Sequence, residues 1–244
     1  MTRDEPPQLD PAIEEWLDGF LATLSHDLRN PLNAMLGWAH LLQSDALPAD
    51  MRQRALEKLE RNGRAQAEIL NDLLEVSRTV GGRTQLLAGD AAFDTPAVRA
   101  ARPHTPDRST ALAGVRLLLV EDEPDGREFL AILLGMHGAS VEVASSVVEA
   151  LRLVETGQFD VLVSDLGLPD RDGYELIRTI RLLASNSSLP AVAVTASASP
   201  QDRARALEAG YGWHIPKPVD PALLLEALSE AIGNARDSRP SDAR

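Results

Sequence analysis

Ser164-Asp165-Leu166-Gly167-Leu168-Pro169 closes a short apolar run with an acidic residue and then turns into a loop. Around it, from Gly114 onward, short apolar runs alternate with segments of helical periodicity. The expected strands are 115–120, 140–143, 160–164, 191–194 and 213–215, and the expected helices are 125–137, 146–156, 174–183, 200–209 and 221–232. Five such strand–helix units predict an α/β domain with a doubly wound, five-stranded parallel sheet. The functional site of such a sheet lies at the carboxyl ends of its strands.

Polar side chains follow the expected strands at this edge. Glu121 and Asp122 come after the first strand, Asp165 after the third, Thr195 closes the fourth, and Lys217 follows the fifth. Clustered carboxylates are costly unless a cation lies among them, and an all-oxygen site suits Mg²⁺. Surface acids near strand ends are common, so a single one of these residues would mean little. The site is inferred because all five occur in order at the strand ends. Together they supply a carboxylate nucleophile, a metal, a hydroxyl and an ammonium, which suit a phosphoryl group.

Four segments around these residues closely resemble the receiver domains of two-component response regulators, which have a flavodoxin-like fold. The segments are 119–124, 164–173, 194–196 and 216–218. The resemblance covers about residues 114–233 and implies that Asp165 is the phosphoacceptor, gripped as an acyl phosphate by Thr195 and Lys217. It also implies a Mg²⁺ site made by Glu121, Asp122, Asp165 and the backbone carbonyl of Gly167.

Two positions depart from the receiver pattern. Glu121 stands where Asp is frequent, although its longer side chain still reaches a metal or its water. His214 occupies the usual aromatic switch position three residues before Lys217, so a tyrosine-like mechanism is not assumed. The haloacid dehalogenase family, a rival doubly wound phosphotransferase, has its nucleophilic aspartate after the first strand and a second aspartate two residues later. Glu121-Asp122-Glu123 does not fit that pattern.

The N-terminal third has a helical pattern. Apolar residues recur at a 4-3-4-3 spacing from Leu17 to Leu42, and Asp10-Pro11 has the form of a helix start. A turn leads to a second amphipathic stretch from about Met51 to Val80, which Gly81-Gly82 ends. The pattern predicts an antiparallel helical hairpin. Two helices cannot cover so wide an apolar face, so we expect a homodimer that forms a four-helix bundle.

A histidine lies within this first helix, in the segment Ser-His-Asp-Leu-Arg-Asn-Pro-Leu at 25–32. His26 is two residues from the nearest apolar positions, so it points away from the apolar stripe and toward solvent. The neighbouring Asp27 can keep the imidazole in the neutral tautomer that attacks phosphorus. Asn30, one turn further on, can position a phosphoryl oxygen or an attacking water beside it.

Taken alone, an exposed helical histidine is usually a solvated side chain. The segment 20–42, however, strongly resembles the H-box of the dimerisation and phosphoacceptor domain of histidine kinases, and 61–83 resembles that domain's second helix. The resemblance covers about residues 12–83. It implies phosphorylation of His26, acid–base assistance by Asp27, and phosphatase chemistry supported by Asn30.

The resemblances divide the chain into five parts: an N-terminal extension (1–11), the hairpin (12–83), a flexible linker (84–113), the receiver (114–233) and a tail (234–244). The linker region is rich in alanine, threonine, proline and arginine without periodicity. A histidine kinase also needs an ATP-binding domain with an asparagine box and glycine-rich boxes, and this sequence shows neither. The domain order is that of a hybrid histidine kinase without its ATP-binding domain, so autonomous kinase activity is not expected.

The composition of the sequence limits the kinds of partner that we expect. The formal net charge is −13 and both expected domains are acidic, so we expect no binding to nucleic acid or to anionic membranes. The sequence contains no cysteine, which excludes thiol chemistry. No apolar run approaches the ~20 residues of a membrane span, and the expected location is the cytoplasm.

Three functions fit these patterns. In the favoured one, a phosphorelay protein, a separate histidine kinase or phosphotransfer protein loads one site. Phosphate then passes between His26 and Asp165 with Mg²⁺, within the chain or across the dimer, and a downstream response regulator is a further partner. The second is a stand-alone receiver switch that a degenerate hairpin only dimerises. The third is a phosphatase or phosphate sink, which uses Asp27 and Asn30 or the receiver's own hydrolysis.

Overall fold

The computed structural model describes residues 11–44, 47–80, 111–183, 187–196 and 199–237. Most of the expected N-terminal extension, of the expected linker and of the tail lies outside these residues. Within the described part of the chain, no helix is both long enough and apolar enough to cross a lipid bilayer.

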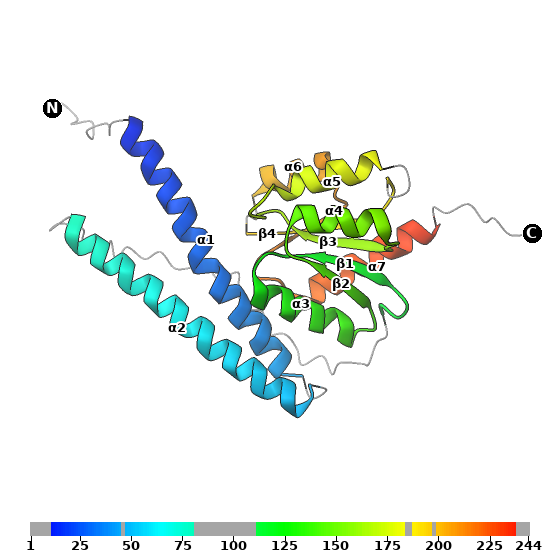
Figure 1. The fold of residues 1–244 in the computed structure, drawn as a ribbon, viewed down its shortest axis with the longest axis horizontal. Coiled ribbons are helices and arrows are strands. Elements are labelled where there is room, and N and C mark those ends of the chain that lie inside the picture. The colour runs from blue at the N-terminus through cyan, green and yellow to red at the C-terminus, as the bar shows by residue number, and fades with distance from the viewer. Residues whose placement is uncertain (1–10, 45–46, 81–110, 184–186, 197–198, 238–244) are drawn as a thin grey trace, which may run out of the picture.

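The N-terminal helices form the predicted hairpin. Helix α1 spans Pro11–Leu42 and continues through Pro31, and helix α2 spans Ala49–Val80. The two helices pack against each other, and Figure 1 shows them closest near the loop that joins them. Figure 1 shows their loop end beside the α/β domain and their far ends projecting away from it.

The C-terminal half forms the predicted parallel sheet. Its strands are β1 (Arg116–Val120), β2 (Ser140–Ala144), β3 (Val161–Asp165), β4 (Ala191–Thr195) and β5 (Trp213–Pro216). They pair in the order β2-β1-β3-β4-β5, and every pair is parallel. This order follows from right-handed crossovers that place helices on both faces of the sheet.

The helices that connect the strands lie close to their predicted ranges. They are α3 (Pro124–Met136), α4 (Val147–Thr156), α5 (Gly173–Leu182), α6 (Pro200–Ala209) and α7 (Pro221–Asp237). The predicted end of α7 at 232 was wrong, because the helix runs on through Gly233. A single helical glycine costs only about 1 kcal/mol, and the buried Ala231 and Ile232 anchor this turn on the sheet.

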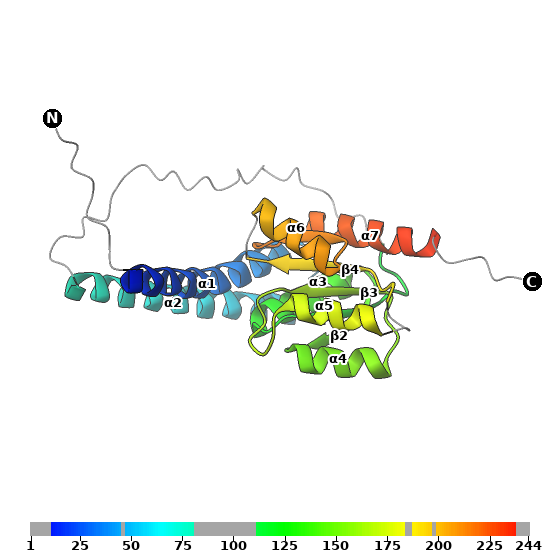
Figure 2. The same ribbon diagram turned by 90° about the horizontal axis from the view of Figure 1, so that it is seen from above.

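Apolar layers pack on both faces of the sheet. Figure 1 shows α4, α5 and α6 above the strands and α3 below them, and Figure 2 gives the view from above. Side chains of α3 and α7 form one core with the sheet, and side chains of α4, α5 and α6 form the other. Each central strand is therefore buried on both faces, as a parallel sheet requires. The charged residues that follow these strands are left at the open edge of the sheet.

The hairpin packs directly on α3. Ala34 and Trp38 of α1 are buried in the same core cluster as Phe129 and Leu130 of α3. Gly37 makes this close approach possible, because a Cβ atom there would lie 2.6 Å from the Phe129 ring. The expectation that only a second hairpin would cover this apolar face is therefore incomplete, since the α/β domain covers part of it.

Candidate functional site

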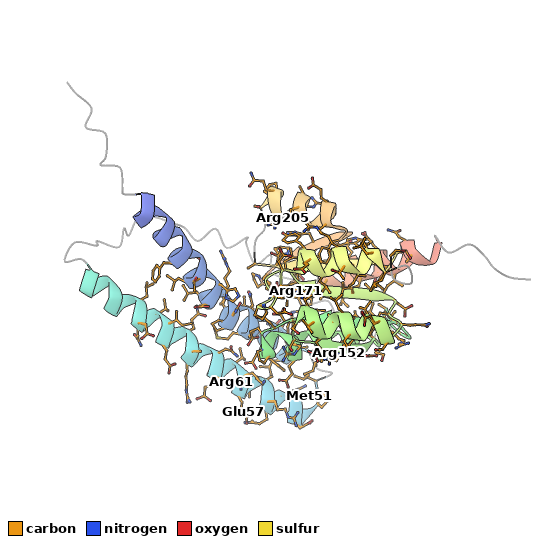
Figure 3. The ribbon with its side chains drawn as sticks, turned by 45° about the horizontal axis from the view of Figure 1, so that its top comes forward. Met51, Glu57, Arg61, Arg152, Arg171 and Arg205 are labelled. Atoms are coloured by element: carbon orange, nitrogen blue, oxygen red, sulfur yellow. The ribbon has the colours of Figure 1, made fainter. Side chains whose placement is uncertain are left out.

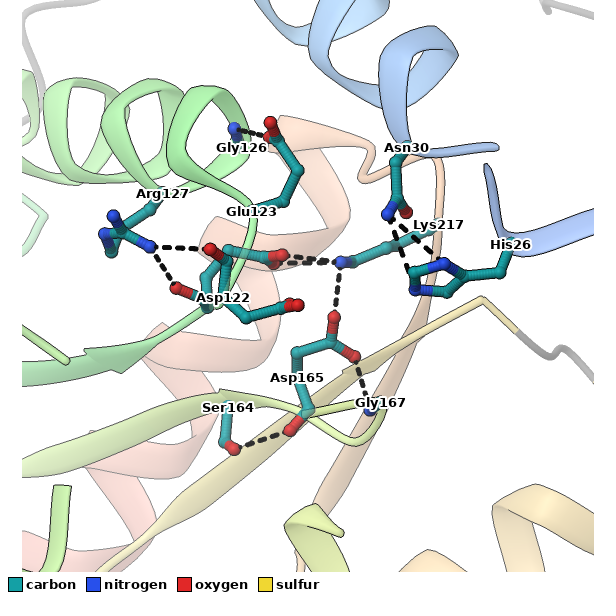
Figure 4. Close-up of polar contacts among 11 residues, drawn as sticks. His26, Asn30, Asp122, Glu123, Gly126, Arg127, Ser164, Asp165, Gly167 and Lys217 are labelled. Atoms are coloured by element: carbon teal, nitrogen blue, oxygen red, sulfur yellow. Dashed lines mark hydrogen bonds and ion pairs between the residues drawn. The ribbon is translucent and has the colours of Figure 1, made fainter. Parts of the chain in front are cut away.

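The predicted acidic residues and Lys217 meet at the carboxyl edge of the sheet. Glu121 follows β1, Asp165 ends β3, and Lys217 follows β5. The Lys217 Nζ lies 2.6 Å from Asp165 Oδ2 and 2.9 Å from Glu121 Oε1, and the three side chains are buried (Figure 4). The second oxygen of Asp165, Oδ1, accepts a hydrogen bond from the Gly167 amide at 2.9 Å.

Burial and charge act against each other in this cluster. Burial raises the pKa of Glu121 to about 7, although the ammonium of Lys217 opposes the shift. Burial disfavours the charged form of Lys217, but Glu121 and Asp165 outweigh it and hold the lysine pKa above its ordinary value. Lys217 therefore keeps its positive charge between the two carboxyl groups.

The acids of this edge fit a divalent metal ion. Glu121, Asp122 and Asp165 each offer a carboxylate oxygen, and these oxygens lie within 4.8 Å of one another. Arg127 holds the loop after β1 in place, since its Nη1 donates to the backbone carbonyls of Glu121 at 2.6 Å and of Asp122 at 3.0 Å. An all-oxygen set with more negative than positive charge suits a hard cation such as Mg²⁺.

Thr195 and His214 lie on the strands beside Asp165. In the register of the sheet, Asp165 pairs with Val194 of β4, and Thr195 pairs with Pro216 of β5, so the strand of the buried threonine lies between those of Asp165 and Lys217. The His214 Nε2 is buried and has no hydrogen-bond partner among the described residues, and burial lowers its pKa. His214 therefore favours the neutral imidazole.

His26 lies on α1 between two polar neighbours. Its Nδ1 is 3.3 Å from the Asp27 carboxylate, and the Asn30 amide nitrogen is 3.4 Å from its Nε2. The His26 side chain is 48% exposed, in agreement with the prediction from its helical position. Asn30 lines one cavity with Glu121 and Lys217, and Figure 4 shows the Asn30 amide and the imidazole directed toward the lysine.

Comparisons with known proteins agree with this geometry. The family described as His Kinase A (phospho-acceptor) domain matches residues 16–82, and the response regulator receiver domain matches residues 117–229. The chain is a two-component signalling protein that joins a phosphoacceptor hairpin to a receiver. This family assignment confirms the resemblances found in the sequence.

Individual relatives match mainly one part of the chain. An uncharacterized 14.6 kDa protein of Leptolyngbya boryana is 42% identical over 119 residues, which are 49% of this chain and 91% of that protein. The sensor histidine kinase RcsC of Salmonella typhimurium is 33% identical over 60% of this chain, but this match spans only 15% of the kinase.

A solved structure gives a third comparison. The receiver domain of sensor histidine kinase PA1611 from Pseudomonas aeruginosa, with a magnesium ion coordinated in its active site cleft, is 34% identical. The alignment covers 50% of this chain and 99% of that one, with a TM-score of 0.47.

A charged cluster holds the receiver on the phosphoacceptor hairpin. The buried carboxylate of Asp125, in the first turn of α3, accepts from Lys58 Nζ at 2.7 Å, from Asn62 Nδ2 at 2.6 Å and from Arg61. Lys58 also pairs with Glu128 at 2.5 Å. Figure 3 shows Arg61 on the part of α2 that runs beside the receiver. We call the five residues Lys58, Arg61, Asn62, Asp125 and Glu128 the docking cluster.

The docking cluster stabilises the charged form of Asp125. Burial would raise the pKa of this carboxyl, but the hydrogen bonds from Lys58, Arg61 and Asn62 hold it below its ordinary value. Arg61 is 62% exposed and adds little, whereas Lys58 is only 20% exposed. The contact between hairpin and receiver therefore depends chiefly on Asp125, Lys58 and Asn62.

Sequence reasoning found the residues at the strand ends and the histidine, but it missed the docking cluster. Asp125 has the pattern of an ordinary acid in the first turn of a helix, which the helix dipole favours. Lys58 and Asn62 are spaced at i and i+4 on α2, which indicated only that they share a face of that helix. A signal was present, because Asn62 lies seven residues after Ala55 and so places a polar side chain in the apolar face of α2.

Proposed function

We propose that this chain is a phosphorelay protein in which a phosphoryl group passes between His26 and Asp165 of the same chain. The docking of α1 on α3 is the observation that supports this most. It brings Asn30, which contacts the His26 ring, into one cavity with Glu121 and Lys217, the residues beside Asp165. A residue that contacts the donor thus shares a cavity with two residues that lie beside the acceptor.

The surroundings of His26 select its reactive nitrogen. Asp27 lies next to Nδ1, so Nδ1 carries the proton and donates a hydrogen bond to the carboxylate. The lone pair of Nε2, which accepts from the Asn30 amide at 3.4 Å, is then the one that bonds with phosphorus when this contact opens. Asp27 also stabilises the positive charge of the imidazolium that phosphorylation at Nε2 creates.

The transfer step conserves charge and protons. A carboxylate oxygen of Asp165 attacks the phosphorus and forms a P–O bond, while the P–N bond to His26 Nε2 breaks. The electron pair of that bond stays on Nε2, and the ring returns to neutral imidazole with its proton on Nδ1. Lys217, already 2.6 Å from Asp165, balances the negative charge that the phosphoryl group brings.

Glu121, Asp122 and Asp165, together with the backbone carbonyl of Gly167, are the proposed ligands of Mg²⁺. Bound there, the ion would neutralise the oxygens of the transferred group. Thr195 is proposed to hold one phosphoryl oxygen through its hydroxyl, because it ends the strand between Asp165 and Lys217.

A second copy of the chain is the proposed partner of the hairpin. After the receiver has docked, Leu32 and Leu36 of α1 and Leu56 and Leu70 of α2 remain 41–53% exposed. Leu32 and Leu36 are four residues apart, and Leu56 and Leu70 are two heptads apart, so each pair lies on one face of its helix. Four exposed leucines of this kind fit a four-helix bundle made by a homodimer.

Phosphate donors distinguish the proposed function from its alternatives. Both matched domains are phosphoacceptors, so we propose loading by a separate histidine kinase or phosphotransfer protein. We expect acetyl phosphate with Mg²⁺ to label the wild-type chain and His26→Gln, but not Asp165→Asn. Phosphoramidate in EDTA should label His26, and added Mg²⁺ should then move the label to Asp165.

Three outcomes would decide against the relay. Label from ATP alone would show a kinase activity that this account does not provide. Labelling of Asp165 that is indifferent to His26→Gln with every protein donor would favour the receiver switch. Release of inorganic phosphate that depends on Asn30, without accumulation of label on His26, would favour the phosphatase.

A further inference from the structure

Between residues 26 and 37, one face of α1 is directed at the receiver. His26, Asn30, Asn33 and Gly37 follow a spacing of four, three and four residues, which places them on one side of a helix. Asn30 and Asn33 line a cavity with Glu121 and Lys217, and Gly37 lies against the Phe129 ring. The proposed site and the docking contact explain His26, Asn30 and Gly37, but neither of them explains Asn33.

The side-chain amide of Asn33 lacks an acceptor. Its Nδ2 is buried and makes no hydrogen bond to any residue in the described part of the chain. A buried donor without an acceptor destabilises a protein, so such a group calls for an explanation. For docking alone, leucine would serve better at this position, because it has a similar size and nothing to satisfy.

The cavity beside Asn33 has the size and the lining of a water site. It measures about 20 Å³ and lies between α1 and the loop that joins β1 to α3. Its polar lining comes from Asn30, Asn33, Glu121, Glu123 and Lys217. A buried water needs roughly 10–15 Å³ and two to four polar partners, and both conditions are met here.

We propose that Asn33 is a positioning residue of the phosphotransfer site, acting through a water molecule shared with the carboxylates of the β1–α3 loop. Asn33 Nδ2 donates to this water, and the water donates to Glu121 or Glu123. The link fixes the helix that carries His26 against the loop that carries Glu121. This role rests on the proposed transfer from His26 to Asp165, because it sets the distance over which the phosphoryl group moves.

Two substitutions at this position separate hydrogen bonding from packing. Asn33→Leu replaces the amide with methyl groups and removes the unpaired donor, so docking and thermal stability are expected to be unchanged or improved. The rate of transfer from His26 to Asp165 is expected to fall about tenfold, as for a lost hydrogen bond. Asn33→Ser keeps a donor and leaves room for water, and it should stay within about threefold of the wild-type rate.

A second measurement detects the bound water directly and does not depend on phosphoryl transfer. In the wild-type chain labelled with ¹⁵N, the Asn33 side-chain amide should show magnetisation exchange with a bound water. This signal should vanish in Asp125→Arg, which separates the domains. Absence of the signal in the docked wild type would overturn the proposal, and so would an Asn33→Leu chain that transfers at the wild-type rate.

Failure of the proposed function would look different. A wild-type chain that transfers no phosphate, yet shows the water at Asn33, would refute the relay and the positioning role while leaving the water link intact. Equal losses in Asn33→Leu and Asn33→Ser, with docking retained, would show that Asn33 does not act through a donated hydrogen bond and would overturn the proposal.

Discussion

Replacing Asp125 with arginine is expected to slow phosphoryl transfer from His26 to Asp165 by at least about a hundredfold. The substitution leaves Lys58 and Asn62 without their buried acceptor and sets a new cation beside Lys58. Breaking a buried charge pair by removal of one partner costs about 3–5 kcal/mol, which exceeds a factor of one hundred in the docking equilibrium. Rapid-quench measurement of chains loaded at His26 checks this rate.

The receiver itself should survive this substitution. Labelling of Asp165 by acetyl phosphate is expected to stay near the wild-type rate, because Asp125 contacts the hairpin and not the metal site. Glu142→Arg is the matched control. It makes the same charge reversal at Glu142 of β2, which forms an exposed pair with Arg116 of β1, and it should change neither rate. Undiminished transfer from His26 in Asp125→Arg would mean that the observed docking does not carry the reaction.

Replacing Lys217 with methionine is expected to lower acyl phosphate formation by about 10²–10³-fold with either donor. The ammonium is the group that balances charge on Asp165, and loss of one such electrostatic contact has effects of this size. Two buried carboxylates, Glu121 and Asp165, are also left facing each other. The melting temperature of the variant without Mg²⁺ should fall, and Mg²⁺ should recover part of the loss.

Lys58→Met is the control for this experiment, because it makes the same chemical change in the docking cluster. It should weaken transfer from His26 and leave acetyl phosphate labelling unchanged. The two lysines thus have separable effects, one on the chemistry of the receiver and one on its position. A Lys217→Met chain that acetyl phosphate labels as fast as the wild type would refute the role given to Lys217.

The sequence predicted much of the fold for local reasons. Apolar runs bounded by turn residues predicted both ends of each of the five strands to within one residue. The heptad-like spacing predicted both long helices. Glu121, Asp165 and Lys217 could be brought together on paper because parallel strands place their carboxyl ends on one edge. The exposure of His26 followed from its angle to the apolar stripe.

The contact between hairpin and receiver could not be predicted in this way. It joins Lys58 to Asp125, 67 residues further along the chain, and no periodicity within either domain specifies that pairing. The buried Trp38 shows the same limit. Its place in the apolar stripe predicted burial, but the receiver helix α3 provides part of the cover that we expected from a second hairpin.

We propose that phosphate passes from His26 to Asp165 within one chain. The most direct test loads His26 in EDTA, starts the reaction with Mg²⁺, and follows the transfer in a single turnover. We predict first-order kinetics with a rate that does not depend on protein concentration. Heterodimers of loaded Asp165→Asn chains with His26→Gln chains should transfer at least about tenfold more slowly, because the cavity shared by Asn30, Glu121 and Lys217 is formed within one chain. Transfer between the mixed chains at the wild-type rate would contradict the claim.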